Sequence, residues 1–328
     1  MKFPAKVQSL DGIDLGNRRL HLAIGMFDGV HLGHQSVIES AVHSARSREA
    51  VAGVLTFWPH PSAFFRPEDP TRLIMDPAAK TRMFFELGAE LVIEQPFDGD
   101  FARVPAEEFV SYLLERLPGL EAIYVGENWR FGRGRKGDVS LLVETARRQG
   151  VNVVSMPRLH FNGEPVSSSR IRELLTGGEL EEANRLLGYG YVTEGEVRSG
   201  RGLGREIGYP TLNLPWNGDL RPQYGVYGVR VSPADERRAA GSTGSVAERA
   251  RRGVANFGVR PTVTRETPDD PVLEVHLLEE DGCPFASGDR LVVEWLFFLR
   301  PEKRFGELDT LKEQIARDRA AAVVRFGT

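Results

Sequence analysis

The first half of the chain alternates short apolar, β-prone segments with amphipathic segments of helical period. This alternation is typical of a parallel sheet whose faces are covered by helices. The expected strands are 20–24, 51–57, 89–94, 121–126 and 151–156. The expected helices are 33–48, 77–87, 105–117 and 138–149. The sequence therefore predicts an α/β domain, in which ligands bind at the carboxyl ends of the strands.

The pattern changes after two short helices expected within 168–187, the first ended by Gly177-Gly178 and the second by Gly188. From Tyr189 to about Arg300, short strands alternate with turn residues, which favours an antiparallel β-barrel. The final segment has the period of an amphipathic helix. Its apolar stripe is Leu308, Leu311, Ile315 and Ala322. We expect two domains, 1–187 and 188–328, and a mobile surface loop over about 234–252.

Composition narrows the possible partners. The chain has 328 residues, 41% of them hydrophobic, which is enough for two cores. Its net charge of −4 argues against a general nucleic-acid or anionic-membrane binder. Cys283 alone forms no internal disulfide, and there is neither a signal-peptide pattern nor a membrane-spanning run. We therefore expect a cytoplasmic protein, and we leave homo-oligomer formation open.

The segment Gly25–His34 joins the first strand to the first helix through glycines and two histidines. Unpaired N–H groups and the positive end of the helix dipole favour a phosphate at such a helix start. His31 and His34 are three residues apart, so their rings should face the same side and could neutralise charge during polyphosphate cleavage. The alternatives are a polar surface turn or half of a metal site. The remaining histidines and the single cysteine form no second ligand pair at helical spacing, so we favour the nucleotide site.

The segments Phe57–Pro61 and Gly126–Gly132 also follow expected strands and should lie at the same end of the sheet. Gly132–Gly137 matches GxGxxG, but it does not directly follow a strand and lacks the distant acidic partner, so we reject NAD binding. Its basic residues, beside Asn128, are instead candidates for contacts with ATP phosphates or for an ordinary solvated loop. Val166–Arg172 offers hydroxyls and cations at a helix start, which suits either capping or a phosphate clamp.

In the second half, a glycine-rich segment precedes the turn Pro210-Thr211-Leu212-Asn213. Glycines let the backbone approach phosphate closely. Thr211 and Asn213, on alternate positions, are neutral oxygen ligands suited to a Mg²⁺ carried by ATP. Glu274 lies opposite the apolar face of its strand, where a carboxylate could accept a hydroxyl proton during phosphoryl transfer. A surface turn with a polar strand start is the alternative, and GxxxxGK[ST] is absent, so the chain is not a P-loop kinase.

With these residues in view, nearly the whole chain resembles the bacterial bifunctional riboflavin kinase/FAD synthetase family. The first half resembles its Rossmann-like nucleotidyltransferase domain. The matching segments there are Gly25–His34, Phe57–Pro61, Gly126–Gly132 and Val166–Arg172. The second half resembles its riboflavin kinase β-barrel with a C-terminal helix. The matching segments there are Gly200–Asn213, Gly225–Tyr227, Val254–Thr262 and Phe298–Phe305.

The resemblance implies two reactions. The barrel would transfer the γ-phosphate of ATP to riboflavin, with Glu274 as base and with Thr211 and Asn213 on Mg²⁺-ATP. The first domain would then join the resulting FMN to the AMP part of a second ATP, giving FAD and pyrophosphate. The residues implied to stabilise charge there are His31, His34, Asn128, Ser168 and Arg172.

The resemblance also implies binding residues beyond these. The implied nucleotide contacts are Gly25, Phe27, Asp28, Gly29, Gly33, Ser167, Ser168, Ser169, Arg170, Gly200, Gly202, Gly204 and Pro210. The implied flavin contacts are Phe57, Pro59, His60, Pro61 and Arg300. Leu212 stands where the family often has alanine, and we expect its side chain to point away from the metal-facing pair.

Three rival functions remain open at this point. One is an FMN adenylyltransferase with a catalytically impaired kinase barrel, against which Thr211, Asn213 and Glu274 together weigh. Another is a noncatalytic, nucleic-acid-binding barrel, which the overall acidity opposes. The third is a cytidylyltransferase, which shares the HxGH motif but leaves the second domain unexplained.

Overall fold

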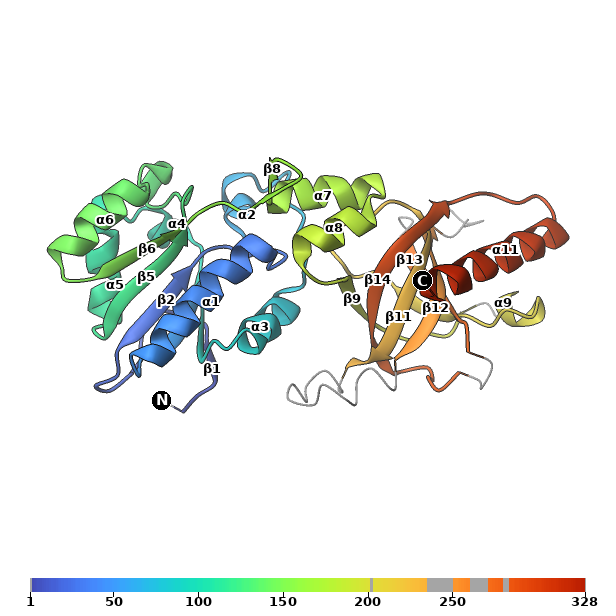
Figure 1. Cartoon of the computed structure of the whole chain (residues 1–328), viewed down its shortest axis with the longest axis horizontal. Helices are drawn as coiled ribbons and strands as arrows, with labels where there is room; N and C mark the ends of the chain where they lie inside the picture. The colour runs from blue at the N-terminus through green and yellow to red at the C-terminus, as the bar shows by residue number, and fades with distance from the viewer. Residues whose placement is uncertain (1, 201–202, 235–249, 260–270, 280–282, 328) are drawn as a thin grey trace. The chain divides into compact units, whose positions relative to one another are not determined.

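The computed structural model describes residues 2–200, 203–234, 250–259, 271–279 and 283–327. The chain divides into two compact units, Met1–Ser168 and Ser169–Thr328. The boundary between these units falls earlier than residues 187/188, where the sequence places the domain boundary, and that functional boundary stays a prediction. Figure 1 shows a sheet flanked by helices in the first unit, and an antiparallel sheet with a long C-terminal helix in the second.

The first unit is built on a six-stranded parallel sheet of order β1-β4-β3-β2-β5-β6. Its strands are β1 (Ala5–Val7), β2 (Leu20–Ile24), β3 (Val51–Trp58), β4 (Leu91–Pro96), β5 (Leu120–Gly126) and β6 (Asn152–Met156). Every residue of β2 is buried, and so is all of β3 except Trp58, because both faces of a parallel sheet are covered. The predicted α/β domain is confirmed.

Helices connect these strands. They are α1 (Leu32–Ser47), α2 (Pro61–Phe65), α3 (Pro77–Glu86), α4 (Gly99–Ala102), α5 (Phe109–Arg116) and α6 (Val139–Arg148), with 3₁₀ turns η1 (Ala106–Glu108) and η2 (Arg133–Arg135). α1 lies across one face of the sheet (Figure 1) and buries a single stripe of side chains against it. The stripe consists of Val37, Ile38, Ala41, Val42 and Ala45. The helix predicted over 105–117 is divided into η1 and α5, and β1, α2 and α4 were not predicted.

The second unit is built on a six-stranded antiparallel sheet of order β10-β13-β12-β11-β14-β9. Its strands are β9 (Tyr191–Glu196), β10 (Leu212–Pro215), β11 (Gly225–Pro233), β12 (Arg251–Val259), β13 (Pro271–Leu277) and β14 (Arg290–Pro301). A bridge between Arg198 and Asn213 connects the segment after β9 to the opposite edge strand β10. The sheet thus curls into the barrel that the sequence predicts, with Tyr227, Phe257 and Trp295 fully buried in its core.

The helices of this unit are α7 (Ser168–Gly177), α8 (Leu180–Leu187), α9 (Leu203–Glu206) and α11 (Leu308–Gly327). The predicted pair over 168–187 is confirmed, and Gly188 ends α8 in the left-handed conformation at φ 81°. α8 packs on β14, where Asn184 Nδ2 donates to the Trp295 carbonyl at 2.8 Å. This contact attaches α8 to the second unit. The hairpin β7 (His160–Phe161) and β8 (Glu164–Pro165) precedes α7.

Two predictions in the second unit need correction. Leu308 does not belong to the buried stripe of the last helix, because it is 49% exposed at a first turn whose residues 308–310 all face solvent. The surface loop predicted to extend to Arg252 ends sooner, because Arg251 and Arg252 pair with β11 as part of β12. Residues 235–249 of that loop, Gly202 and Arg260–Thr262 lie outside the described residues.

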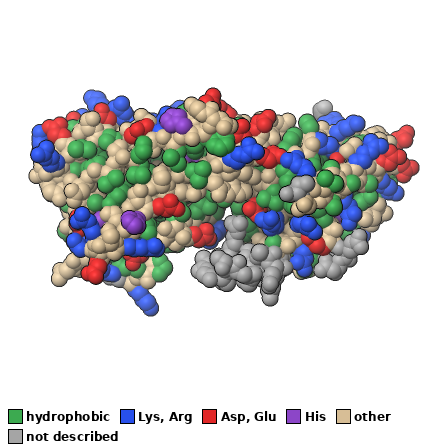
Figure 2. All heavy atoms as spheres, in the orientation of Figure 1, with side chains coloured by type: hydrophobic (Ala, Val, Ile, Leu, Met, Phe, Trp, Pro, Cys, Tyr) green, Lys and Arg blue, Asp and Glu red, His purple; other side chains and the backbone are tan. Residues whose placement is uncertain are grey.

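Charged groups are mixed on the face of the molecule that Figure 2 shows. On the face shown in Figure 2, acidic and basic side chains lie interspersed with hydrophobic and uncharged ones. Among the described residues, no helix combines the length and the apolar character that crossing a membrane requires.

Candidate active sites

The turn between β2 and α1 presents the two histidines together. His31 is the N-cap of α1, and its Nδ1 accepts a hydrogen bond from the backbone N–H of His34 at 3.3 Å. The two rings are stacked, with centroids 3.5 Å apart. The predicted common orientation of the rings is confirmed, while His31 is only 5% exposed. His31 can therefore cap α1 and also stabilise negative charge on a ligand at this helix start.

The backbone of this turn takes unusual conformations. Phe27 has φ 52° and Val30 has φ 32°, both in the region that non-glycine residues rarely adopt. The Phe27 ring is buried, lies edge-on to the His34 ring and covers Gly25, where a Cβ would come within 2.8 Å of it. Such strain persists only where the surroundings fix the chain, and it concentrates at functional sites.

Side chains from distant segments hold the carbonyl groups of the turn. The Met26 carbonyl accepts from Thr56 Oγ1 at 3.1 Å and from Lys80 Nζ at 3.2 Å. The Asp28 carbonyl accepts from Ser168 Oγ at 2.9 Å, so the 166–172 segment does start beside this turn. The Val30 carbonyl accepts from Gln35 Nε2 at 2.8 Å. These bonds fix the peptide planes, and with them the direction of the N–H groups.

Asp28, which the resemblance implies as a nucleotide contact, has a structural partner. Its carboxylate is 4% exposed and accepts from the Ile74 backbone N–H at 3.1 and 3.2 Å. It therefore ties the segment before α3 to the turn. A direct nucleotide contact of this side chain stays a prediction.

Lys80 is a residue of this site that the sequence reasoning missed. It lies on α3 with 6% exposure, and burial lowers its pKa from 10.5 to about 8. The available signal was its spacing: Lys80 and Phe84 are four residues apart on one helix face, and Phe84 is fully buried.

The segment Phe57–Pro61 lies at the end of β3, next to that turn. A small hollow there is lined by Met26, Asp28, Phe57, Trp58, His60, Leu73, Met75, Pro77 and Lys80. His60 caps α2 by accepting from the Ser62 N–H at 3.1 Å, and Pro61 takes the first helical position. The Phe57 ring is 7% exposed and packs on Phe101 in the core, with centroids 5.2 Å apart. Flavin contacts of Phe57, Pro59, His60 and Pro61 stay predictions, and Trp58 is the exposed aromatic of the segment, at 43%.

Asn128 follows β5, which neighbours β2 in the parallel sheet, so its turn lies at the same sheet edge as Gly25–His34. The turn is anchored by Trp129 and Phe131, whose stacked rings are 4.7 Å apart and pack on Phe109. Asn128 itself is exposed. The adjacent basic loop is also exposed, and Arg130 lies 3.6 Å from the Asp138 carboxylate.

The cations predicted on α7 have different surroundings. Arg170 forms an ion pair with Glu182 of α8 at 2.5 Å, so its guanidinium connects the two helices. Ser169 is exposed and Arg172 is half-buried. All three residues belong to the second compact unit, so their place at the first site, like that of Ser167, stays a prediction.

In the barrel, polar side chains form a row across neighbouring strands. Asn213 on β10 pairs with Glu274 on β13, and Glu274 pairs with Asn256 on β12. The row continues through Val226 on β11 to Arg300 on β14. Because directly paired residues lie on one face of a sheet, the five side chains share one side of the barrel. Asn256 was not predicted, since its position depends on strand pairing that no local pattern reveals.

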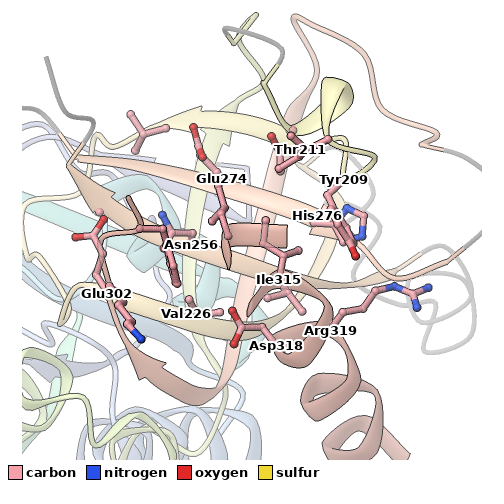
Figure 3. A pocket seen from close by; sticks show the side chains of 18 of the residues that line it. Tyr209, Thr211, Val226, Asn256, Glu274, His276, Glu302, Ile315, Asp318 and Arg319 are labelled. Atoms are coloured by element: carbon pink, nitrogen blue, oxygen red, sulfur yellow. The ribbon is translucent and has the colours of Figure 1, made fainter. Parts of the chain in front are cut away.

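This row lines a cavity of about 340 Å³, shown in Figure 3. Glu274 and Asn256 extend from adjacent strands, and Ile315 and Asp318 of α11 face the same space. The cavity has a largely apolar lining. Its apolar members are Ile207, Val226, Val254, Val259, Val272, Phe305, Leu311 and Ile315. Such a lining with a few convergent polar groups suits a flat aromatic ligand that carries a polar chain.

A second cavity of about 630 Å³ adjoins the Pro210–Asn213 turn and is also lined by Gly200 and Arg205. The two cavities share only Gly204, Thr211, Asn213 and His276 among the described residues that line them. Glu274 lines the first cavity and not the second. The geometry thus places two neutral oxygen groups at the boundary between the two cavities and a carboxylate beside them, in the first cavity.

Thr211 and Asn213 fit a magnesium ion carried by a nucleotide. A Cβ at Gly200 would come within 2.3 Å of the Asn213 amide, and one at Gly204 within 3.3 Å of Thr211 Oγ1. The glycines therefore keep the space beside both donors free of side chains. Leu212 is 6% exposed in the barrel core, which confirms that it points away from the pair. His276 Nδ1 donates to the Pro210 carbonyl at 3.0 Å and so fixes the start of the turn.

Arg300, predicted as a flavin contact, is held by an acidic partner. Its Nε and Nη2 donate to the two carboxylate oxygens of Asp318 at 2.9 and 2.7 Å. Gln314 Nε2 donates to the same carboxylate at 2.9 Å. This pairing joins α11 to β14 at the wall of the cavity and leaves a flavin contact of Arg300 as a prediction.

Together, the parallel sheet with its HxGH turn and the barrel with its two adjoining cavities have the architecture of a two-domain transferase. Comparisons with known proteins identify which one. The FAD synthetase family model matches residues 15–170, and the riboflavin kinase family model matches residues 187–326. The chain belongs to the bifunctional riboflavin kinase/FAD synthetase family.

Individual relatives cover almost all of the chain. The bifunctional riboflavin kinase/FMN adenylyltransferase of Escherichia coli K12 is 35% identical over 93% of this chain and 92% of its own length. The protein of the same description from Bacillus subtilis strain 168 is 32% identical, with the same two shares. A crystal structure described as a macrolide-efflux protein from Streptococcus pneumoniae matches with a TM-score of 0.82 and 26% identity, covering 97% of this chain and 98% of that one.

Proposed function

We propose that this protein makes FAD from riboflavin in two steps, each at its own site. The barrel phosphorylates riboflavin to FMN with one ATP, and the first unit adenylylates FMN with a second ATP. The observation that carries the kinase assignment is the placement of Glu274 beside Asn213, where the two cavities of the barrel meet. Family membership supports both activities.

In the kinase step, riboflavin occupies the apolar cavity and ATP the adjoining one, with the γ-phosphate at the shared boundary. Glu274 accepts the proton of the ribityl 5′-hydroxyl as its oxygen bonds to the γ-phosphorus. The bond from that phosphorus to the β,γ-bridging oxygen breaks, and ADP leaves. Thr211 and Asn213 would hold Mg²⁺, which neutralises phosphate charge when it is bound with ATP.

In the adenylyl step, a phosphate oxygen of FMN attacks the α-phosphorus of ATP and pyrophosphate leaves. The N–H groups at the start of α1 orient the phosphates, while His31 and His34 stabilise the charge that develops. Asn128, Ser168 and Arg172 complete this site as the resemblance implies. The step needs positioning and charge neutralisation rather than a covalent enzyme intermediate.

These roles entail small-molecule partners, namely riboflavin, FMN and ATP, and a cytoplasmic location where ATP is available. Nucleic acid and membrane are not expected partners, given the net charge of −4. The decisive experiment incubates the purified chain with riboflavin, ATP and Mg²⁺ and separates the flavins by chromatography. FMN and FAD should both form. FAD made from supplied FMN, without any FMN made from riboflavin, would instead favour an adenylyltransferase with an impaired barrel.

A further inference from the structure

Lys80 is buried beneath the strained turn that precedes α1. Its ammonium lies 3.2 Å from the Met26 carbonyl and 3.1 Å from Thr56 Oγ1. Thr56 uses its own hydroxyl hydrogen to donate to the same Met26 carbonyl at 3.1 Å, so its oxygen accepts from Lys80. Lysine is rarely buried without such partners, because removing an ammonium from water is costly. Lys80 and Thr56 thus both donate to the Met26 carbonyl oxygen and are also hydrogen-bonded to each other.

That carbonyl belongs to the residue immediately before Phe27, whose φ is 52°. The peptide plane between Met26 and Phe27 sets where the next N–H groups of the turn point. Thr56 alone would hold this peptide plane with one neutral hydrogen bond to the Met26 carbonyl. The Lys80 ammonium adds a second, charge-assisted hydrogen bond to the same oxygen. Loss of this bond would let the strained turn relax toward a more populated conformation.

Several charged groups face Lys80. The Asp28 and Glu94 carboxylates favour its charged form, and Lys6, which forms an ion pair with Glu94 at 3.0 Å, opposes it. His60 lines the same small hollow. Burial is the largest influence, and the pKa of the ammonium is about 8. The amine therefore titrates close to neutral pH, unlike an exposed lysine.

We propose that Lys80 is a positioning residue of adenylyl transfer, which fixes the Met26 carbonyl and through it the backbone that receives the substrate phosphates. The proposal rests on the proposed adenylyltransferase activity of the first unit. Lys80 acts through the turn and makes no step of the reaction itself. The alternative is a lysine that only stabilises the fold.

The test uses the full-length chain, because its kinase activity reports independently on every preparation. In Lys80→Met, kcat for FAD formation from FMN and ATP should fall about 10- to 100-fold, as expected for a misplaced reaction geometry. FMN formation from riboflavin should change less than about twofold. Thr56→Val removes the neutral donor to Met26 and the oxygen that accepts from Lys80, but it leaves the bond from the ammonium to the Met26 carbonyl, so it should give a smaller loss of the same kind. Lys6→Met removes a nearby positive charge without touching the turn and should leave kcat near that of the wild type.

A pH profile separates positioning from simple stabilisation. The ratio of the adenylyl rate to the kinase rate in the wild type should fall as pH rises through about 8, where the ammonium loses its charge. This ratio should be flat over the same range in Lys80→Met. Kinase activity near the wild-type level with unchanged kcat for FAD formation in Lys80→Met would overturn the proposal.

If Lys80→Met loses both activities or fails to fold, the proposal is tested instead by the pH profile of the wild type and by the rate of FAD formation in Thr56→Val. A flat wild-type ratio from pH 7 to 9 together with an unaffected Thr56→Val would then reject the positioning role. A wild-type chain that makes no FAD at all would instead refute the proposed adenylyltransferase function. That outcome is visible before any variant is compared.

Discussion

Glu274 on β13 lies directly opposite Asn213 on β10, and both side chains line the same cavity. The antiparallel register fixes this neighbourhood, because paired residues share a face of the sheet. The carboxylate proposed to accept the proton is thereby held beside a ligand proposed for the metal, although the two residues are far apart in the sequence.

Replacing this carboxylate should separate the two activities. In Glu274→Gln, FMN formation should fall about 10²- to 10⁴-fold, since the amide cannot take the hydroxyl proton. FAD formation from supplied FMN should be unchanged. Chromatographic rates for both products provide the measurement. Glu294→Gln, on the outer side of the barrel beside Arg230, is the matched control and should leave both rates intact. Equal loss of both activities in Glu274→Gln would contradict independent sites.

The two roles of His31 can be distinguished by two substitutions. His31→Ala removes both the cap and the ring and should destabilise the first unit by about 0.5–2 kcal/mol. His31→Asn restores an acceptor for the His34 N–H, so it should keep more of that stability. FAD formation should be lost in both variants and FMN formation retained. Recovery of FAD formation in His31→Asn would show that the ring matters only as a cap.

Substitution of Thr211 or Asn213 should change the Mg²⁺ dependence of the kinase activity and leave that of FAD formation unchanged. In Thr211→Val and in Asn213→Ala, kinase activity should require more Mg²⁺, because a neutral oxygen donor is missing. Thr211→Ser retains the hydroxyl and should behave like the wild type. Titration of Mg²⁺ at fixed ATP measures the shift. An unchanged kinase titration in Thr211→Val would remove Thr211 from the metal site.

The contact between Arg300 and Asp318 should affect flavin binding. In Asp318→Asn, α11 loses a bidentate partner at the cavity wall, so we expect KM for riboflavin to rise by about tenfold, equivalent to about 1.4 kcal/mol. Arg317→Gln breaks an exposed ion pair with Glu313 on the same helix and should have little effect. Kinase rates at varied riboflavin give both values. Similar KM values in the two variants would show that the buried pair does not shape the cavity.

The first unit should lose stability in acid through His21. Burial is the main cause that lowers the pKa of this histidine below 6.5, although the Glu121 carboxylate partly opposes it. The unfolded chain then binds the proton more readily, so stability is present above about pH 6.5 and falls as pH decreases below it. Hydrogen exchange of β2 and β5 between pH 5 and 7 measures the change. His21→Gln cannot titrate there and should show a weaker pH dependence. An identical dependence in both proteins would exclude His21 as the cause.

Local sequence patterns were sufficient to predict the elements in which the period of apolar residues matches the buried face. The parallel sheet follows from apolar runs such as Leu20–Ile24, and the barrel from dense turns between short strands. The histidine pair follows from three-residue spacing at a helix start, which needs no tertiary information.

Other features depend on contacts that are distant in sequence. Lys80 looks like an ordinary helical lysine until α3 places it against Met26 and Thr56. Asn256 becomes part of a polar row only through its register with Glu274. Leu308 fits the apolar period of the last helix, yet it lies at an exposed first turn that the period cannot locate.

Burial alternates residue by residue along β13, so that Glu274 and His276 face the cavity while Leu273, Val275 and Leu277 face the core. In a strand with this alternation, inserting or deleting an odd number of residues exchanges the two faces, whereas an even number keeps them. Deleting one residue before Glu274 would turn the carboxylate into the core and a leucine or valine toward the substrate. Deleting two would restore the faces. A change of one residue in the length of this strand should therefore inactivate the kinase site, whereas a change of two residues should preserve it.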